Sequence, residues 1–278
     1  MGWGDYIMTS GIVRRLKGQN PNLQILIKEP FNNSPQYKDI FYKNPYITTA
    51  DSFNNTLPHI KIPRILTGKN NEDNTNIIWH KDRVAEVGNF YPKKEETLFA
   101  DNNIKEIKEH WISKNKKKPK GLIFVSDIAK TNVLLDNKVI NYEHSVNKDW
   151  GRKKWQEFAN LISNEYILIK TSNVKEGYIN GFYYIVCDFR TVYSIMDRCD
   201  FYIGNEGGLS HLWAITKKKG IVFFGHWIPP YLTGYPFHIN ISVSYNNHCG
   251  SLKRCEECID FFYNLNPEYI KYLLEKNI

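Results

Sequence analysis

The chain has 278 residues, of which 42% are hydrophobic and 14% aromatic, and its formal net charge is +8. This composition excludes a disordered chain, and no apolar run reaches the ~18 residues of a membrane-spanning helix. The positive charge suits phosphate-bearing ligands or an anionic membrane surface as well as it suits simple solubility. Because no signal peptide precedes the first polar residues, we expect a cytoplasmic or membrane-peripheral protein without disulfides.

A glycine turn, Gly2-Trp3-Gly4-Asp5, stands at the start of the chain and leads directly into a predicted helix. The helix is indicated by an apolar stripe at helical spacing, formed by Met8, Ile12, Val13 and Leu16, with Gly18 as its C-cap. Asp5 either complements the positive start of this helix or acts as its N-cap. The run LQILI at 23–27 then predicts a strand.

The rest of the first half gives weaker signals. Short strands are predicted at 46–49, 64–66 and 77–79, and a charged helix at 103–111. A lysine-rich run with a proline, 113–121, marks the expected boundary between domains 1–118 and 119–278. Because no aromatic residues interleave with its lysines, we interpret the run as a linker and expect no nucleic-acid partner.

Strands alternate with helices through the second half, which is typical of an α/β architecture with a parallel sheet. Strands are predicted at 122–125, 138–141, 166–169, 183–187 and 239–243, with helices around 155–162 and 192–196 and from Pro267. The aromatic, proline-rich run at 226–238 is predicted as loop.

The clearest unit of the sequence runs from Asp200 to Gly225. Its predicted strands are 201–203 and 221–224, and the buried helix face between them is Leu209, Leu212 and Trp213. Three lysines at 217–219, followed by Gly220, indicate where this helix ends. Such a unit implies two parallel strands joined by a right-handed crossover.

The turn inside this unit, Gly204-Asn205-Glu206-Gly207-Gly208, is a candidate ligand site. Adjacent glycines allow a ligand to approach the backbone, and the first amides of a helix bind anions. A carboxylate at Glu206 repels bare phosphate and suits the hydroxyl groups of a sugar or ribose better. In the alternative interpretation, the glycines only form a tight turn and His211 is a buried core residue.

Three cysteines near the end of the chain, Cys249, Cys255 and Cys258, stand close to His248. Thiolates and imidazoles are ligands for zinc and iron. The spacing differs from standard zinc-finger patterns, so the sequence leaves open whether these cysteines bind a metal, and we assign no metal ligand.

Three stretches, in this order, resemble glycosyltransferase family 9, the bacterial heptosyltransferases. The opening Gly-Trp-Gly-Asp turn resembles the family's G-x-G-D start, and Lys148-x-Trp150-x4-Trp155 resembles its K-x-W motif. The unit at 204–225 resembles its D-x-G-x-x-H-x-A loop and the following strand that ends in Phe-Gly. The terminal cysteines and the last helix also fit, whereas 29–120 matches by position only.

The resemblance implies the GT-B fold, in which two Rossmann-like domains with parallel sheets face each other across a cleft. The N-terminal domain would hold the acceptor, and the C-terminal domain a nucleotide-sugar donor, without a metal or other cofactor. The chain departs from the family in having Glu206 where Asp is usual and in lacking the strand before the first glycine turn. It is also short, so we expect a reduced acceptor domain.

The resemblance also implies roles for individual residues. Asp5 matches the acid proposed as general base toward the acceptor hydroxyl. Lys148 would contact the donor phosphates, and His211 would have a structural or supporting role. The full set of implied donor-site residues is Gly4, Lys148, Glu206, Gly207, Gly208, Leu209 and His211.

The sequence thus predicts a metal-independent GT-B glycosyltransferase that moves a sugar, such as the heptose of ADP-heptose. The expected acceptor is a cell-surface glycan precursor, as in lipopolysaccharide biosynthesis, or a lipid-linked or protein acceptor. One alternative is a nucleotide-sugar epimerase of the same fold, with Glu206 and His211 as its acid/base candidates. Another is a catalytically degenerate nucleotide-sugar-binding module. The basic charge also leaves room for peripheral contact with an anionic membrane.

Overall fold

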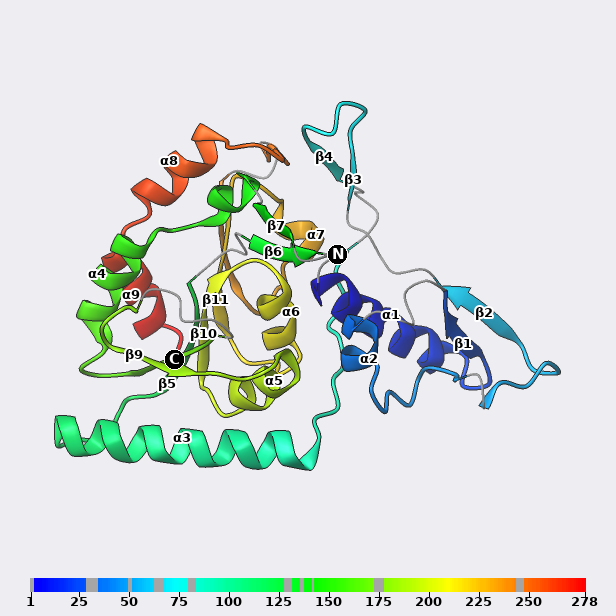
Figure 1. The fold of residues 1–278 in the computed structure, drawn as a ribbon, viewed down its shortest axis with the longest axis horizontal. Coiled ribbons are helices and arrows are strands. Elements are labelled where there is room, and N and C mark those ends of the chain that lie inside the picture. The colour runs from blue at the N-terminus through cyan, green and yellow to red at the C-terminus, as the bar shows by residue number, and fades with distance from the viewer. Residues whose placement is uncertain are drawn as a thin grey trace.

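The computed structural model describes residues 3–28, 35–49, 52–62, 68–79, 84–127, 132–135, 138–141, 143–172, 178–243 and 248–278. It shows a small first half and a larger second half, joined by the long helix α3 (Lys94–Asn115) (Figure 1). In this part of the chain, no helix combines the length and the apolar character needed to cross a bilayer.

The first half is built on α1 (Trp3–Gln19), the helix that the apolar stripe predicted. β1 (Gln24–Ile27) and β2 (His59–Ile62) pair in parallel next to it, while β3 (Gly68–Asn70) and β4 (Ile77–Trp79) form an antiparallel hairpin. α2 (Pro35–Ile40) packs on α1. Within the described residues the parallel sheet of this half consists of these two strands.

The second half is centred on a six-stranded sheet in the order β12-β11-β10-β5-β8-β9, in which every neighbouring pair is parallel. Its strands are β5 (Leu122–Ser126), β8 (Ile167–Thr171), β9 (Phe182–Ile185), β10 (Phe201–Asn205), β11 (Gly220–Gly225) and β12 (Ile239–Ser242). The chain starts in the centre at β5, moves outward to β9, then returns to β10 and moves outward the other way. This is the Rossmann order, and its switch point between β5 and β10 is where such sheets bind ligands.

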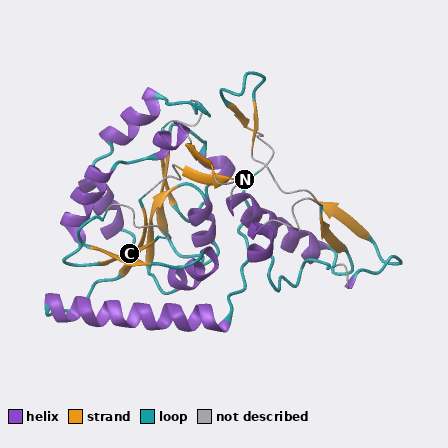
Figure 2. Ribbon diagram, viewed as in Figure 1, coloured by secondary structure: helices purple, strands orange, loops and turns teal. Residues whose placement is uncertain are grey.

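Helices cover both faces of this sheet (Figures 1 and 2). α4 (Arg152–Ile162) and α9 (Pro267–Glu275) cover one face of the sheet, where they contact side chains such as Ile203 of β10. α5 (Phe189–Asp197) and α6 (Gly208–Ala214) pack on the other face, which receives Tyr202 because side chains alternate along a strand. That second core also includes residues of α1 and α3, so it is shared between the two halves.

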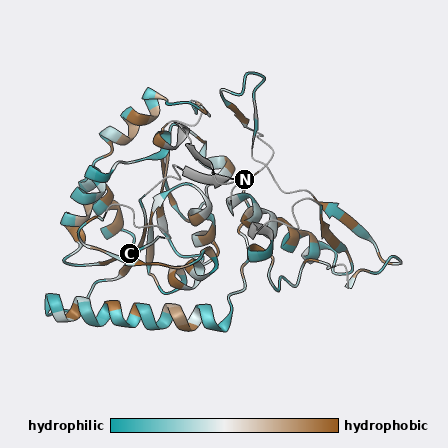
Figure 3. Ribbon diagram, in the orientation of Figure 1, coloured by the Kyte–Doolittle hydropathy of each residue, from teal (hydrophilic) through white to brown (hydrophobic). Residues whose placement is uncertain are grey.

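α3 packs along α5 and is mostly hydrophilic, with a few hydrophobic bands (Figure 3). Its buried residues, Glu96, Ala100, Ile104 and Trp111, recur at helical spacing and form one face. The helix ends at Lys116, which takes the left-handed C-cap conformation with φ of 55°. The predicted helix at 103–111 is therefore correct but covers only part of the element.

A buried arginine fastens α5 to the first half. Arg190 pairs with Glu96 of α3 at 2.7 Å between Nε and Oε1, and both side chains are almost fully buried. The same guanidinium donates hydrogen bonds to the carbonyl oxygens of Asp39 in α2 and Tyr91 before α3. Removing one partner of such a buried ion pair is strongly destabilising, so this contact fixes how the two halves meet.

The remaining elements of the second half are short. They are the hairpin of β6 (Asn132–Leu135) and β7 (Lys138–Asn141), the 3-10 helix η3 (Glu143–Lys148), α7 (Pro230–Thr233) and α8 (Glu256–Asn264). The predicted strand at 138–141 is confirmed as β7.

Several sequence predictions need correction. The segment 46–49, predicted as a strand, is irregular, and the strand predicted at 64–66 lies outside the described residues. α6 ends at Ala214, so the lysines at 217–219 follow the helix and do not form its last turn, and Gly220 opens β11. The loop predicted at 226–238 contains α7. α2, β2 and α8 were missed because they are short and lack a long periodic pattern.

Candidate functional site

The two glycine segments singled out in the sequence meet in the structure, but residues 3–5 of the first are helical and do not form the predicted turn. α1 begins at Trp3 and packs against α6, which begins at Gly208 immediately beyond β10 (Figure 1). A Cβ atom added at Gly208 would lie 3.1 Å from Cβ of Trp3, and one at Gly4 would lie 2.6 Å from Cδ2 of His211. A side chain at position 4 would therefore clash with His211, and one at position 208 would be a tight fit against Trp3, a reason for glycine that the sequence did not reveal.

The sheet places Lys148 and Glu206 together at its switch point. Lys148 is the last residue of η3, in the connection from β5 to α4, and Glu206 directly follows β10. Nζ of Lys148 donates to Oε2 of Glu206 at 2.6 Å, and the two side chains are 14% and 6% exposed. The ammonium also lies 3.9 Å from the ring centroid of Trp227, a cation–π distance.

Glu206 is ionised in this environment. Burial alone would raise the pKa of Glu206, but the ammonium of Lys148 and the imidazole of His211 hold it well below its usual range. The carboxylate therefore faces protein partners here, whereas the sequence had suggested sugar or ribose hydroxyls for it.

His211 connects Glu206 to a tyrosine that sequence reasoning missed. Its Nε2 lies 3.6 Å from Oε1 of Glu206, and its Nδ1 lies 2.8 Å from the hydroxyl of Tyr235. Burial raises the pKa of Tyr235, and the charge of Glu206 raises it further, so the phenol keeps its proton. The hydroxyl of Tyr235 also donates to the carbonyl oxygen of Glu86 at 3.4 Å. His211 is thus a buried, fully partnered histidine, as the structural interpretation expected.

The turn before α6 shows one further reason for glycine. Gly207 has φ of +155° and ψ of −161°, a conformation that residues with a Cβ rarely adopt. Its N–H donates to Oγ of Ser210 at 3.0 Å, and that hydroxyl donates to the carbonyl oxygen of Gly207 at 2.9 Å. This backbone amide was expected to bind a diphosphate, but in the structure it donates its hydrogen bond to Ser210. Leu209 is partly buried in the adjoining core.

Asp5 lies in the first turn of α1, as the third residue of the helix. It is therefore not the N-cap, and that alternative is wrong. The helix start around it is fixed by Trp3, whose ring stacks on Phe189 of α5 at 3.8 Å between centroids. Asp5 thus belongs to the end of α1 that packs on α6.

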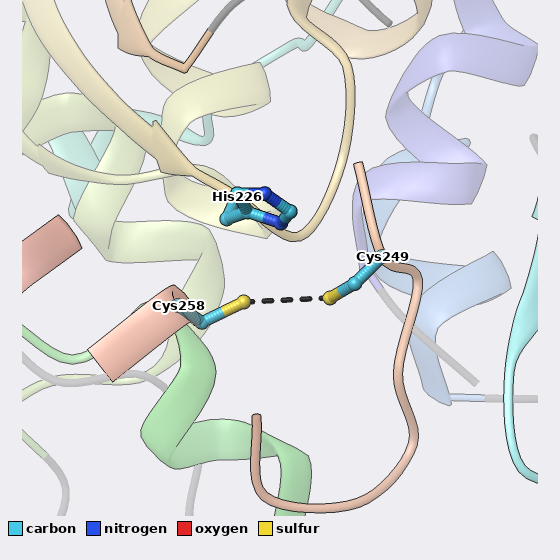
Figure 4. Close-up of side chains that lie close together, drawn as sticks. All are labelled: His226, Cys249 and Cys258. Carbon is cyan, nitrogen blue, oxygen red and sulfur yellow. Dashed lines mark hydrogen bonds between the residues drawn. The ribbon is translucent and has the colours of Figure 1, made fainter. Parts of the chain in front are cut away.

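A second cluster lies at the start of α8 and the end of β11 (Figure 4). Ligand atoms of His226, Cys249 and Cys258 all lie within 4.8 Å of one another, and the two sulfurs are 3.4 Å apart. The hydrogen bond from Cys258 lowers the pKa of Cys249 to about 5 against the opposing effect of burial, with smaller contributions from Ser251, His226 and Cys255. Such soft thiolate and imidazole donors fit zinc or iron.

The histidine of this cluster was not the one that the sequence suggested. His248 lies next to Cys249 in the chain, but its Nε2 is 2.9 Å from Oγ of Ser242 instead. His226, at the opposite end of the loop, points toward the sulfurs (Figure 4). No local spacing signal marks His226, because it reaches the cluster only through the fold.

Three solved structures are similar to the chain over 99% of its length. The glycosyl transferase family 9 structure from Veillonella parvula DSM 2008 is 11% identical, with 94% of that chain covered and a TM-score of 0.58. The E. coli ADP-heptose lps heptosyltransferase II is 9% identical, with 96% covered and a TM-score of 0.56. The iron-containing dodecameric glycosyltransferase TibC from enterotoxigenic E. coli H10407 is 12% identical, with 76% covered and a TM-score of 0.56.

The match to E. coli heptosyltransferase WaaC spans 58% of this chain and less than half of that one, at 44%, with a TM-score of 0.38. No protein-family model matches the sequence, and no similarity to a curated protein was found. At these identities the likeness establishes the fold. The GT-B class predicted from the motifs is confirmed.

Proposed function

We propose that this chain is a glycosyltransferase of the heptosyltransferase kind, which moves a sugar from a nucleoside diphosphate to an acceptor hydroxyl. The observation that carries the proposal is the ion pair of Lys148 and Glu206 at the switch point of a Rossmann-ordered sheet. Ligands of such sheets bind at this point, and a fixed ammonium there suits a phosphate-bearing ligand. The fold shared with known glycosyltransferases supports the same reading.

On the donor side, Lys148 would turn from Glu206 to the diphosphate. The phosphate charge competes with the carboxylate for the same ammonium, and the positive charge then stabilises the nucleoside diphosphate as it leaves. Glu206 would keep His211 as its partner, so it is not left as an unpaired buried charge. The remaining donor contacts are proposed for Gly4, Gly207, Gly208 and Leu209.

On the acceptor side, Asp5 would be the general base. The acceptor oxygen attacks the anomeric carbon, the bond from that carbon to the diphosphate oxygen breaks, and the proton of the hydroxyl passes to the Asp5 carboxylate. Asp5 is suited to this because it belongs to the first half and to the helix end that packs on α6. The acid and the lysine therefore approach the reaction from different halves.

ADP-heptose is the first donor to test, because a structural neighbour is an ADP-heptose lps heptosyltransferase and TibC has been solved in complex with ADP-D-beta-D-heptose. The proposed acceptor is a glycan, lipid-linked or protein hydroxyl. Peripheral contact with an anionic membrane is consistent with the net charge of +8. The proposal assigns no cofactor to the transfer step.

The cluster of His226, Cys249 and Cys258 is proposed to hold one zinc or iron ion, with Cys255 next to it. The donor set supports this, and a structural neighbour, TibC, is described as iron-containing. The ion would join β11 to the start of α8 and so stabilise the fold, as structural metal sites do. No step of sugar transfer runs through it.

The test begins with thermal shifts against ADP, GDP, UDP and their sugars. A ligand at 100 times its Kd stabilises by about 2.7 kcal/mol, which is readily measured. The best-bound nucleotide sugar is then incubated with acceptor candidates, and release of the nucleoside diphosphate is followed. Conversion of the donor sugar without acceptor would favour the epimerase, and binding without turnover would favour a binding module. Absence of binding to every nucleotide would contradict the proposal.

A further inference from the structure

The residue before Lys148 is a buried asparagine whose side chain is fully used. Asn147 is 0% exposed. Its Nδ2 donates to the carbonyl oxygens of Lys253 at 2.7 Å and Ser251 at 3.3 Å, and its Oδ1 accepts from the N–H of Cys255 at 2.8 Å. All three partners are backbone groups of residues 249–255, which we call the Cys249 loop.

The same loop supports Lys148 from a second direction. Trp227 donates from Nε1 to the carbonyl oxygen of Ser251 at 2.7 Å, and its ring faces the ammonium of Lys148 at 3.9 Å. The backbone next to Lys148 and the aromatic surface at its ammonium are therefore both anchored to the Cys249 loop. If the loop moved, the hydrogen bonds of Asn147 and the ring of Trp227 would move with it.

The Cys249 loop is itself held firmly on two sides. Cys249 at its start lies in the cluster with His226 and Cys258. The β3–β4 hairpin of the first half binds its backbone: Asn76 donates from Nδ2 to the carbonyl of Cys249, Ile77 from N to Gly250, and Leu252 donates to the carbonyl of Thr75. The loop is thus tied both to the cluster and to the first half.

This anchoring matters because lysine is a flexible point charge. A lysine side chain loses much of its rotamer freedom when it is fixed, and η3 is a short 3-10 segment that gives little intrinsic rigidity. The buried hydrogen bonds of Asn147 supply the rigidity instead. An exposed turn with a solvated asparagine would leave Lys148 mobile.

We propose that Asn147 is a positioning residue for the donor: it ties the backbone of Lys148 to the Cys249 loop, so that the ammonium stays at the switch point where the donor diphosphate binds. This inference rests on the proposed function, in which Lys148 contacts that diphosphate. Asn147 itself touches no ligand and acts through Lys148.

The test is a double-mutant cycle of Asn147→Ala and Lys148→Ala, with ADP as the probe and Kd as the measurement. Lys148→Ala is expected to weaken ADP binding by roughly 10- to 150-fold. Asn147→Ala should weaken it about 3- to 20-fold, and the double variant should bind no more weakly than Lys148→Ala alone. Asn44→Ala is the matched control, because Asn44 is a buried, hydrogen-bonded asparagine of the first half. It should leave the Kd unchanged.

A second measurement works without any nucleotide. Hydrogen exchange of the backbone amides at 146–150 should be faster in Asn147→Ala than in wild type and unchanged in Asn44→Ala. If Asn147→Ala does not fold, Trp227→Phe takes its place in the cycle, since it keeps an aromatic face but removes the Nε1 donor. The inference would be overturned if Asn147→Ala bound ADP with wild-type affinity or left hydrogen exchange at 146–150 unchanged. It would also be overturned if the double variant raised the Kd by the product of the two single-variant factors, because the two residues would then act independently. Failure of wild type to bind any nucleoside diphosphate would instead contradict the proposed function, while exchange would still show whether Asn147 holds Lys148.

Discussion

The backbone of Gly4 lies against the imidazole of His211, so closely that a Cβ at residue 4 would come within 2.6 Å of Cδ2. Gly4 lies in the first turn of the helix that carries Asp5, and His211 is hydrogen-bonded to Tyr235 and faces Glu206. This contact therefore sets the distance between the proposed acceptor side and the proposed donor side.

Replacing Gly4 with alanine should disturb that contact. The added methyl group cannot fit beside a ring that is fixed on both nitrogens, and overpacking of this kind costs typically about 1–3 kcal/mol. The melting temperature of Gly4→Ala should fall, and the double variant Gly4→Ala/His211→Ala should recover part of the loss attributable to the clash. Gly18→Ala is the control, because open space surrounds Gly18. Equal stability of Gly4→Ala and wild type would show that the halves shift freely.

Lys148→Ala should weaken binding of the nucleotide donor by about 1.5–3 kcal/mol, the range for a hydrogen bond to a charged group. It should also lower stability, because Glu206 loses its main counter-charge in a buried site. Calorimetric titration with ADP and a melting curve measure the two effects separately. Lys153→Ala, at an exposed position, controls for the loss of a charge. Donor affinity equal to wild type in a folded Lys148→Ala would refute the assignment.

Asp5→Asn should reduce the transfer rate by about 10²–10⁴-fold, because the amide keeps the size of the side chain but cannot take a proton. Since Asp5 lies inside the first turn and is not the N-cap, its loss should cost helix stability only ~0.3–1 kcal/mol through the helix dipole. The measurements are the single-turnover rate with saturating donor, the Kd of the donor and the melting temperature. An unchanged rate would place the base elsewhere.

Stability should fall in acid partly through Glu206. Its pKa in the folded protein lies below the ordinary value of 4.5, so the unfolded chain takes up its proton first as the pH drops. The contribution of Glu206 is therefore complete above about pH 4.5 and decreases as the pH falls toward the folded pKa. Melting temperatures of wild type and Glu206→Gln, followed from pH 7 to pH 3, should converge in acid. A difference that stays constant over this range would show that Glu206 does not titrate in this way.

Purified protein should contain about one zinc or iron ion per chain if the sulfur cluster is a metal site. Cys249→Ser and Cys258→Ser should each lose the ion and lower the melting temperature, whereas Cys187→Ser, a free cysteine outside the cluster, should retain it. Elemental analysis gives the content, and absorption of a cobalt-substituted sample reports thiolate ligation. Metal-free protein that melts at the same temperature with and without added zinc would contradict the site.

Local sequence patterns allowed most helices and strands of the second half to be predicted. The unit from β10 to β11 was predictable because buried strands are apolar runs and a helix face recurs at fixed spacing. The glycine turn between them was also visible in the sequence, because Gly207 needs a conformation that other residues rarely adopt. The first half was less predictable, because β2 and α2 are too short for periodicity to stand out. In the second half, the end of α6 was placed too late because the lysines and Gly220 imitate a C-terminal signal.

The tertiary structure alone decided which side chains meet. Lys148 pairs with Glu206 because the Rossmann order sets the connections after β5 and β10 side by side. His226, and not the adjacent His248, completes the cysteine cluster because β11 and α8 are neighbours in space. Periodicity reports the face on which a residue lies, since burial follows the repeat of a helix or strand. It carries no information on partners from distant elements, because those contacts depend on strand order and on how the two halves pack.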